Sequence, residues 1–207
     1  MRFYIFFALF STIMAAAINC SAQGFDVLAE IDGNKDLSSL SEVCPSELVK
    51  SESLQFFNKT KFCSTNHETC LILCTQGSSD HCFGLANHFN RNDVDEHYTR
   101  KLYSKSCHLG LASACTNAAA GIRKTDGKEA VKCTTETFKR TCGVKDPWGC
   151  TMYAFALVDG EGVEKNNELA LQALKGSCCF GDSDRACSEA KLLIEEISKA
   201  DSGQKEK

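Results

Sequence analysis

The chain has 207 residues, of which 43% are hydrophobic and 9% aromatic, enough apolar material for one folded domain. Its formal net charge of −4 and sequence pI near 5.8 argue against the basic surface that nucleic acids and anionic membranes attract. Only two prolines occur, which favours helices. We therefore expect a helical protein that binds no nucleic acid.

The N-terminus has the layout of a secretory signal peptide. An apolar run over residues 3–17 follows Arg2, and small residues lie near Ala22. We predict a signal peptide over residues 1–22 and export to a periplasm or the extracellular space. Cys20 leaves lipidation open as an alternative, although Ala17-Ile18-Asn19 matches a lipidation site poorly. No later apolar run approaches the ~20 residues of a membrane-spanning helix, so we expect no span in the mature protein.

Cysteine is unusually abundant, with 14 residues. In an exported chain, this number predicts a disulfide framework. Cleavage after Ala22 removes Cys20 and leaves an odd number, so at least one thiol stays unpaired within the monomer. Nothing in the sequence implies a cofactor.

Residues 23–60 form an N-terminal segment with a degenerate first helix. We expect that helix over residues 41–57, followed by a second helix over residues 61–74. Antiparallel packing would bring Cys44 close to Cys70, a possible disulfide pair.

Residues 61–200 contain pairs of cysteines separated by seven or eight residues. The pairs are Cys74 and Cys82, Cys107 and Cys115, Cys142 and Cys150, and Cys178 or Cys179 with Cys187. The later members at 82, 115, 150 and 187 are 33, 35 and 37 residues apart, the length of two short helices with their turns. The spacing predicts an all-α fold, an α/α solenoid of about four disulfide-stapled hairpins.

Each bridge would close a loop of about nine residues around Gly77, Gly110, Gly143 or Gly181 and contribute roughly 2–3 kcal/mol. For the last bridge, the spacing between cysteines favours Cys179. The helical spacing of apolar residues up to Leu174 and the Gly181-Asp182 turn favour Cys178, which we choose. A vicinal Cys178-Cys179 redox or metal pair is an alternative that geometry disfavours.

Apolar residues recur at helical spacing within the repeats. Position four before the helix-ending cysteine carries Cys70, Tyr103, Phe138 and Leu174, and an earlier core position carries Cys133. Cys70 and Cys133 are therefore interpreted as small buried core residues. Ala86, Ala119 and Ala154 predict close helix contacts. Residues 188–200 predict an amphipathic capping helix, followed by a disordered tail over residues 201–207.

The turn over residues 159–166 carries Gly160 and Gly162 to end one helix and Asn166 or Asn167 to cap the next. Together with Cys150, Ala154, Ala170 and the Leu-Lys-Gly-Ser-Cys ending at Cys178, this turn resembles a Sel-like repeat, a relative of the tetratricopeptide repeat. The cysteine spacing is similar to that of secreted, cysteine-rich Hcp-type proteins, which carry a beta-lactamase label.

Tetratricopeptide geometry, if carried over by this resemblance, implies a groove. Residues two before, one after and five after each helix-starting cysteine would line it, with Arg123 farther along. The groove residues are Asp80, Phe83, Asn87, Thr116, Arg123, Trp148, Thr151 and Phe155. Trp148 is the sole tryptophan, and it is interpreted equally well as a cover for the turn.

Catalytic motifs are weak. Ser188-x-x-Lys191 matches one serine beta-lactamase motif, but its companions Ser-Asp-Asn and Lys-Thr-Gly are absent. His67, Cys70 and Cys74 form a possible metal cluster, which structural cysteines explain more simply, so we expect no metal and assign no catalytic residue.

We therefore favour an exported helical scaffold that binds a protein or peptide. The alternative is hydrolysis or binding of beta-lactams or related cell-wall compounds, as the family label implies. A third possibility is thiol or cofactor handling by the leftover cysteines.

Overall fold

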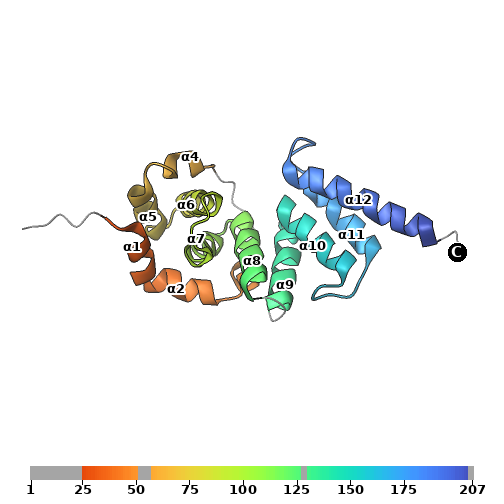
Figure 1. Ribbon diagram of the computed structural model, residues 1–207, viewed down its shortest axis with the longest axis horizontal. Coiled ribbons are helices and arrows are strands. Elements are labelled where there is room, and N and C mark those ends of the chain that lie inside the picture. The colour runs from red at the N-terminus through yellow and green to blue at the C-terminus, as the bar shows by residue number, and fades with distance from the viewer. Residues whose placement is uncertain (1–24, 51–56, 127–129, 205–207) are drawn as a thin grey trace, which may run out of the picture.

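The computed structural model describes residues 25–50, 57–126 and 130–204, and every regular element within these ranges is a helix (Figure 1). The predicted signal peptide and Cys20 lie outside these ranges, as do residues 205–207 of the predicted tail. No helix among the described residues is long and apolar enough to cross a membrane.

Three short helices form the N-terminal segment: α1 (Val27–Gly33), α2 (Lys35–Glu42) and α3 (Pro45–Leu48). The helix expected over residues 41–57 is therefore wrong. α2 ends at Glu42, and Cys44 is extended at φ −60° and ψ 125° because the residue before a proline avoids helical geometry. Pro45 then begins α3 at a position that needs no amide hydrogen.

The single helix expected over residues 61–74 is also wrong. It is divided into α4 (Thr60–Cys63) and α5 (His67–Thr75). Side chains at the break satisfy the carbonyl groups that α4 leaves open: Asn66 Nδ2 donates to the carbonyl of Phe62 at 2.8 Å. A Cys63–Cys70 disulfide spans the break.

The remaining chain is a succession of helices, each packed against the next (Figure 1). They are α6 (Ser79–Arg91), α7 (Glu96–His108), α8 (Ala112–Asp126), α9 (Val131–Gly143), α10 (Pro147–Asp159), α11 (Asn167–Leu174), the 3-10 helix η2 (Lys175–Cys178) and α12 (Arg185–Gln204). α1 lies at one end of the molecule and α12 at the other. The arrangement is a helical, repeat-like fold.

Disulfides join the helices at the four turns where the spacing places them: Cys74–Cys82, Cys107–Cys115, Cys142–Cys150 and Cys178–Cys187. The residue three after the first cysteine of each pair has positive φ: Gly77, Gly110, Lys145 and Gly181 at 105°, 103°, 67° and 95°. In the third turn, the residue with positive φ is thus Lys145 rather than the expected Gly143.

The first three of these turns share a Schellman hydrogen bond that satisfies a carbonyl at the helix end. The donor–acceptor pairs are Ser78 N to Leu73 O at 2.9 Å, Leu111 N to Ser106 O at 3.2 Å and Asp146 N to Thr141 O at 3.0 Å. The same backbone geometry therefore recurs with the same spacing from the cysteines.

The longer turn between α10 and α11 follows its prediction. Gly160 ends α10 at φ 73°, and Gly162 has φ 67°. Asn166 caps α11 by accepting from the Leu169 amide at 2.8 Å.

Hydroxyl groups join neighbouring hairpins at equivalent positions. The hydroxyl oxygens of Thr116 and Thr141 lie 3.0 Å apart, and those of Thr151 and Ser177 lie 2.9 Å apart, both within hydrogen-bond distance. In each pair, the residue after a helix-starting cysteine meets the residue before the next helix-ending cysteine. These bonds are buried, so they stabilise one packing register between hairpins.

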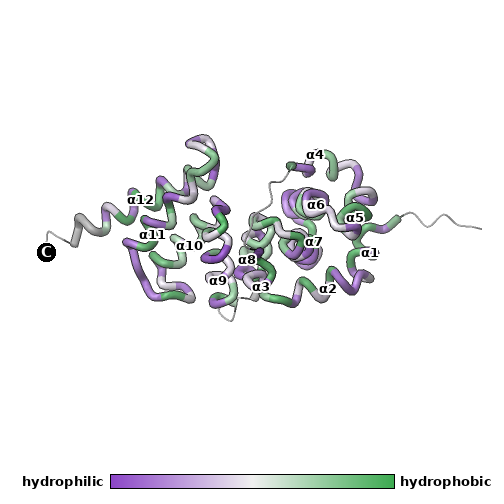
Figure 2. The backbone as a smooth tube through the Cα atoms, turned by 180° about the vertical axis from the view of Figure 1, so that it is seen from behind, coloured by the Kyte–Doolittle hydropathy of each residue, from purple (hydrophilic) through white to green (hydrophobic). Residues whose placement is uncertain are grey.

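The buried side chains form two clusters, one from Ile31 to Ala118 and one from Ala119 to Ile197. Ala86, Ala119 and Ala154 are fully buried, as expected for close helix contacts. Hydrophobic and hydrophilic residues alternate along the helices that surround these clusters (Figure 2). α9, for example, buries Thr134, Phe138 and Thr141 along one face.

The expected Cys44–Cys70 pair is wrong, because Cys44 bonds to Cys133 across 89 positions and Cys70 to Cys63. Cys70 is fully buried in the N-terminal core cluster, as expected, and is also bridged, whereas Cys133 is a bridged and half-buried residue. The C-terminal helix is also longer than expected: α12 continues to Gln204, through the first residues of the predicted tail.

Candidate protein-binding face

Three of the predicted groove residues are buried. Phe83 is 6% exposed and packs against Tyr103 with 5.8 Å between ring centroids. Thr116 is 2% exposed and Thr151 fully buried, each within the hydroxyl contacts between hairpins. These three side chains hold helices together, so they do not line an open groove.

Two other predicted residues are engaged within the fold. The half-buried Asn87 accepts a hydrogen bond from the Tyr103 hydroxyl at 2.8 Å, and burial raises the pKa of that phenol, which keeps it a donor. Arg123 forms an ion pair with Glu161 in the α10–α11 turn. Asn87 thus connects α6 to α7, and Arg123 connects α8 to the α10–α11 turn. Asp80, which was also predicted to line the groove, is half-buried in the first turn of α6.

Trp148 and Phe155 remain as an aromatic pair on α10, two helical turns apart. Trp148 is 36% exposed, whereas Phe155 is half-buried and packs against the C-terminal core cluster. A large aromatic side chain with this exposure can anchor an apolar segment of a partner. Of the predicted groove, this part is accessible.

The first turn of α10 determines where Trp148 lies. Pro147 occupies the first helical position, and Asp146 caps the helix by accepting from the Gly149 amide at 2.8 Å. Gly149 faces α9 so closely that a Cβ atom there would collide with Thr141. Because Pro147 and Gly149 both contact the protein interior, Trp148 is held at the surface between them.

The sequence interpretation missed an apolar contribution from α12. Leu193 and Ile197 are 2% exposed, whereas Leu192 is 62% and Ile194 is 38% exposed. Leu192 lies five residues after Cys187, the offset that places Phe155 after Cys150. The repeat register could have identified Leu192 as an equivalent of Phe155. The amphipathic pattern instead led to the interpretation that this face of the helix only meets water.

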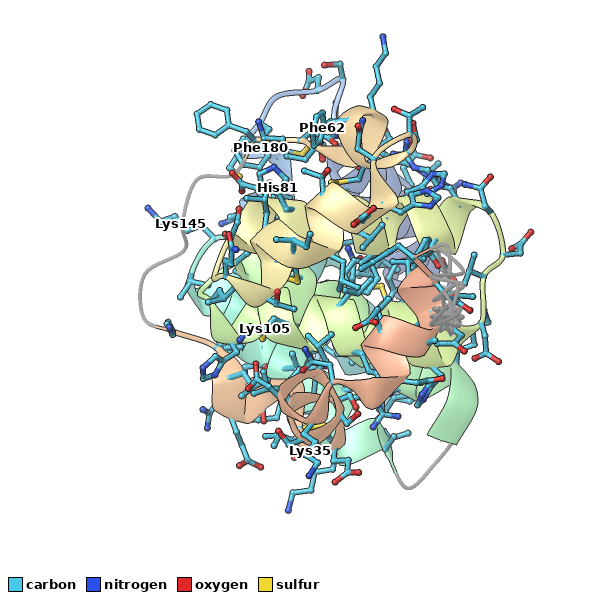
Figure 3. The ribbon with its side chains drawn as sticks, turned by 90° about the vertical axis from the view of Figure 1, so that its left-hand side faces the viewer. Lys35, Phe62, His81, Lys105, Lys145 and Phe180 are labelled. Atoms are coloured by element: carbon cyan, nitrogen blue, oxygen red, sulfur yellow. A yellow bond between two sulfur atoms is a disulfide. The ribbon has the colours of Figure 1, made fainter. Side chains whose placement is uncertain are left out.

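Phe180 is another exposed aromatic side chain, 70% accessible, in the turn before α12 (Figure 3). The neighbouring Cys179 is the free cysteine among the described residues, which decides the last staple in favour of Cys178. Burial raises the pKa of the Cys179 thiol and disfavours the reactive thiolate. The vicinal cysteines therefore form neither a redox pair nor an activated nucleophile.

The remaining chemical motifs have structural contacts. The Ser188 hydroxyl donates to the Asp184 carbonyl at 3.2 Å, and Lys191 forms an ion pair with Asp182 at 3.0 Å. Cys70 and Cys74 are both in disulfides, which removes them as ligands beside His67. Within the described ranges, no three His, Cys, Asp or Glu side chains are grouped as a metal site.

The chain matches no protein-family model, no curated protein and no solved structure.

Proposed function

We propose that this chain is an exported, disulfide-stapled helical solenoid that binds a protein or peptide. The observation that carries this proposal is the 36% exposed Trp148 on α10, with the 62% exposed Leu192 on α12 at the repeat position that Phe155 occupies on α10. α10 and α12 pack against each other, and each is the first helix after a cysteine turn, which supports a shared face in the proposed solenoid. We call Trp148, Phe155 and Leu192 the α10–α12 face.

Three further observations support the solenoid and its compartment. The recurring cysteine turns and the hydroxyl contacts repeat with the period of a helical hairpin. Six disulfides between described residues fit an oxidising compartment. The Sel-like resemblance of the turn over residues 159–166 agrees with this repeat.

The chemistry of the α10–α12 face suggests the class of partner. An indole, a phenyl ring and a leucine side chain offer apolar contacts, so the partner is a segment with exposed apolar side chains. Helical solenoids present extended surfaces to such segments. The rigid first turn of α10 would limit the entropy that Trp148 loses on binding.

The test is selection of a displayed peptide library on the oxidised protein, followed by affinity measurements. Trp148→Ala should weaken the selected peptides by about 30-fold, the loss expected for an aromatic anchor. Leu192→Ser should weaken them as well. Leu169→Ala is the matched control, since Leu169 is also 36% exposed but lies on α11.

Thermal unfolding of each variant separates binding from folding. Phe155→Ala should lower the unfolding temperature because Phe155 packs against the core cluster. Full affinity of a folded Trp148→Ala protein, or equal losses in Leu169→Ala, would refute the α10–α12 face.

A further inference from the structure

A cavity of about 390 Å³ lies where the N-terminal segment meets α7, α8 and α9. Both cysteines of the Cys44–Cys133 disulfide line it. The other lining residues are Glu42, Val43, Arg100, Ile122 and Ala130. The bridge is therefore at the wall of a space large enough for a small molecule or an inserted side chain.

The bridge differs from the other five between described residues in burial. Cys44 and Cys133 are both half-buried, whereas each of the others contains at least one buried cysteine. A thiolate must approach a disulfide sulfur directly, so access limits the rate of exchange. The cavity gives such access at Cys44–Cys133.

A hydroxyl group lies beside one of the two sulfurs. Ser46 Oγ is 3.2 Å from Cys44 Sγ, and Ser46 is only 6% exposed. Thr137 Oγ1, which donates to the Cys133 carbonyl at 2.8 Å, is 4.0 Å from the same sulfur. A hydrogen bond from Ser46 would stabilise negative charge on Cys44 and make it the better leaving group.

Charged groups at the cavity have opposite effects on the approach of a negatively charged thiolate. Arg100, whose Nε donates to the Ser41 carbonyl at 2.9 Å, brings a cation to the wall, and the exposed Glu42 brings an anion. The cation favours approach of a thiolate, and the more exposed carboxylate is better screened by water.

We infer that Cys44–Cys133 is a thiol–disulfide exchange site with a defined direction. An incoming thiolate attacks Cys133 Sγ, a mixed disulfide forms at Cys133, and Cys44 departs as the thiolate beside Ser46. A second thiolate then attacks the sulfur of the attached thiol. Two external thiols are oxidised to one disulfide, and Cys44 and Cys133 are reduced to two thiols.

Exchange at this position changes how the N-terminal segment is attached. Cys44–Cys133 joins that segment to α9, whereas the other five bridges join residues seven to nine positions apart. After reduction, the hydrogen bond of 3.1 Å from Arg140 to the Ser46 carbonyl still holds α3 at α9. The site is thus a redox-sensitive modification site in a fold whose helical hairpins keep their own bridges.

Reduced glutathione is the probe. Free thiols of the oxidised protein are first blocked with N-ethylmaleimide, glutathione is added, and samples are quenched with iodoacetamide for peptide mapping. The first glutathione adduct should form on Cys133, with Cys44 carrying the iodoacetamide label. Adducts that accumulate first at another bridge would overturn the site, and a first adduct on Cys44 would overturn the direction.

Ser46→Ala tests the leaving-group contact. The initial exchange rate should fall by about tenfold, as expected when one hydrogen bond to a charged group is lost. Ser41→Ala is the control, because the Ser41 hydroxyl donates to the Ser38 carbonyl at 2.7 Å and should leave the rate unchanged. An unchanged rate in a folded Ser46→Ala protein would refute the role of Ser46; if that variant does not fold, wild-type mapping decides the site and its direction.

Discussion

At the scale of single residues, Lys145 has a backbone conformation that glycine adopts at the same position in the other cysteine turns. Its φ is 67°, whereas the equivalent residues Gly77, Gly110 and Gly181 have φ near 100°. A Cβ atom makes positive φ unfavourable, and the surrounding Schellman turn nevertheless imposes it. This turn precedes Trp148 by three residues, so the strained position lies at the start of the proposed α10–α12 face.

Lys145→Gly should raise the free energy of unfolding by about 0.5–1 kcal/mol. Relief of positive-φ strain outweighs the greater flexibility of glycine in the unfolded chain. Urea denaturation of the oxidised proteins would measure this gain. The matched control is Lys175→Gly, which should destabilise, since Lys175 has φ −60°. A loss of stability in Lys145→Gly would contradict the turn geometry.

At the scale of helices, Asp146 connects three elements. Its carboxylate accepts from Ser113 on α8, from Thr116 on α8 at 2.7 Å and from the Gly149 amide of α10 at 2.8 Å. Thr116 also contacts Thr141 on α9. Asp146 is 3% exposed, so these hydrogen bonds replace water almost completely.

Asp146→Ala should therefore lower the free energy of unfolding by about 2–4 kcal/mol, through loss of a helix cap and of the acceptor for two hydroxyls. Chemical denaturation monitored by circular dichroism would give the value. Asp95→Ala provides the comparison: Asp95 caps α7 through the His97 amide at 2.9 Å at an exposed position, and its loss should cost about 1 kcal/mol. Equal losses in both variants would exclude the joint role of Asp146.

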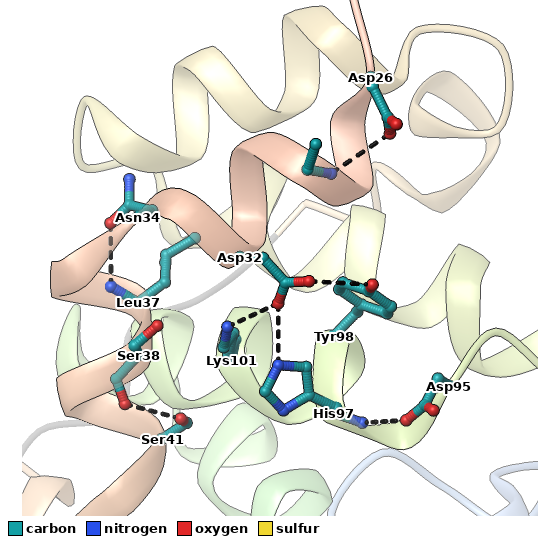
Figure 4. A network of polar contacts seen from close by, with 11 residues as sticks. Asp26, Asp32, Asn34, Leu37, Ser38, Ser41, Asp95, His97, Tyr98 and Lys101 are labelled. Atoms are coloured by element: carbon teal, nitrogen blue, oxygen red, sulfur yellow. Dashed lines mark hydrogen bonds and ion pairs between the residues drawn. The ribbon is translucent and has the colours of Figure 1, made fainter.

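At the scale of the whole molecule, hydrogen bonds attach the N-terminal segment to a helix that is far away in the sequence. Asp32 on α1 accepts from Lys101 and His97 at 2.9 Å and from Tyr98 at 3.1 Å (Figure 4). The Lys101 side chain is only 4% exposed. These hydrogen bonds, from Lys101 first and then His97, lower the pKa of Asp32 from its ordinary 3.8 to about 2.

A lowered pKa in the folded state means that the ionised carboxylate favours folding. The contribution of Asp32 is complete above pH 4 and is lost as pH falls towards 2. Asp32→Asn should be less stable than wild type at pH 5, and the difference should shrink between pH 4 and pH 2. Urea midpoints across this range would test it, with Glu195→Gln as an exposed control. A constant difference at all pH values would contradict the pKa shift.

Much of the fold could be predicted because its signals are local in the sequence. The staples join cysteines eight or nine positions apart, and Gly160, Gly162 and Asn166 end and cap helices through their own backbone and side-chain preferences. The site was predicted less well. Repeat register indicated which face Trp148 and Thr151 share, but one is 36% exposed and the other fully buried.

By itself, the sequence determined the helical class, the period of the hairpins and the four staples that depend on it. Only the tertiary structure decided that Cys44 bonds to Cys133, and that Thr151 is buried while Trp148 is exposed. The physical reason is the separation along the sequence of the residues that determine each feature. Short loops and helix ends are governed by neighbouring residues, whereas a bridge across 89 positions and the exposure of a side chain depend on which helices meet in space.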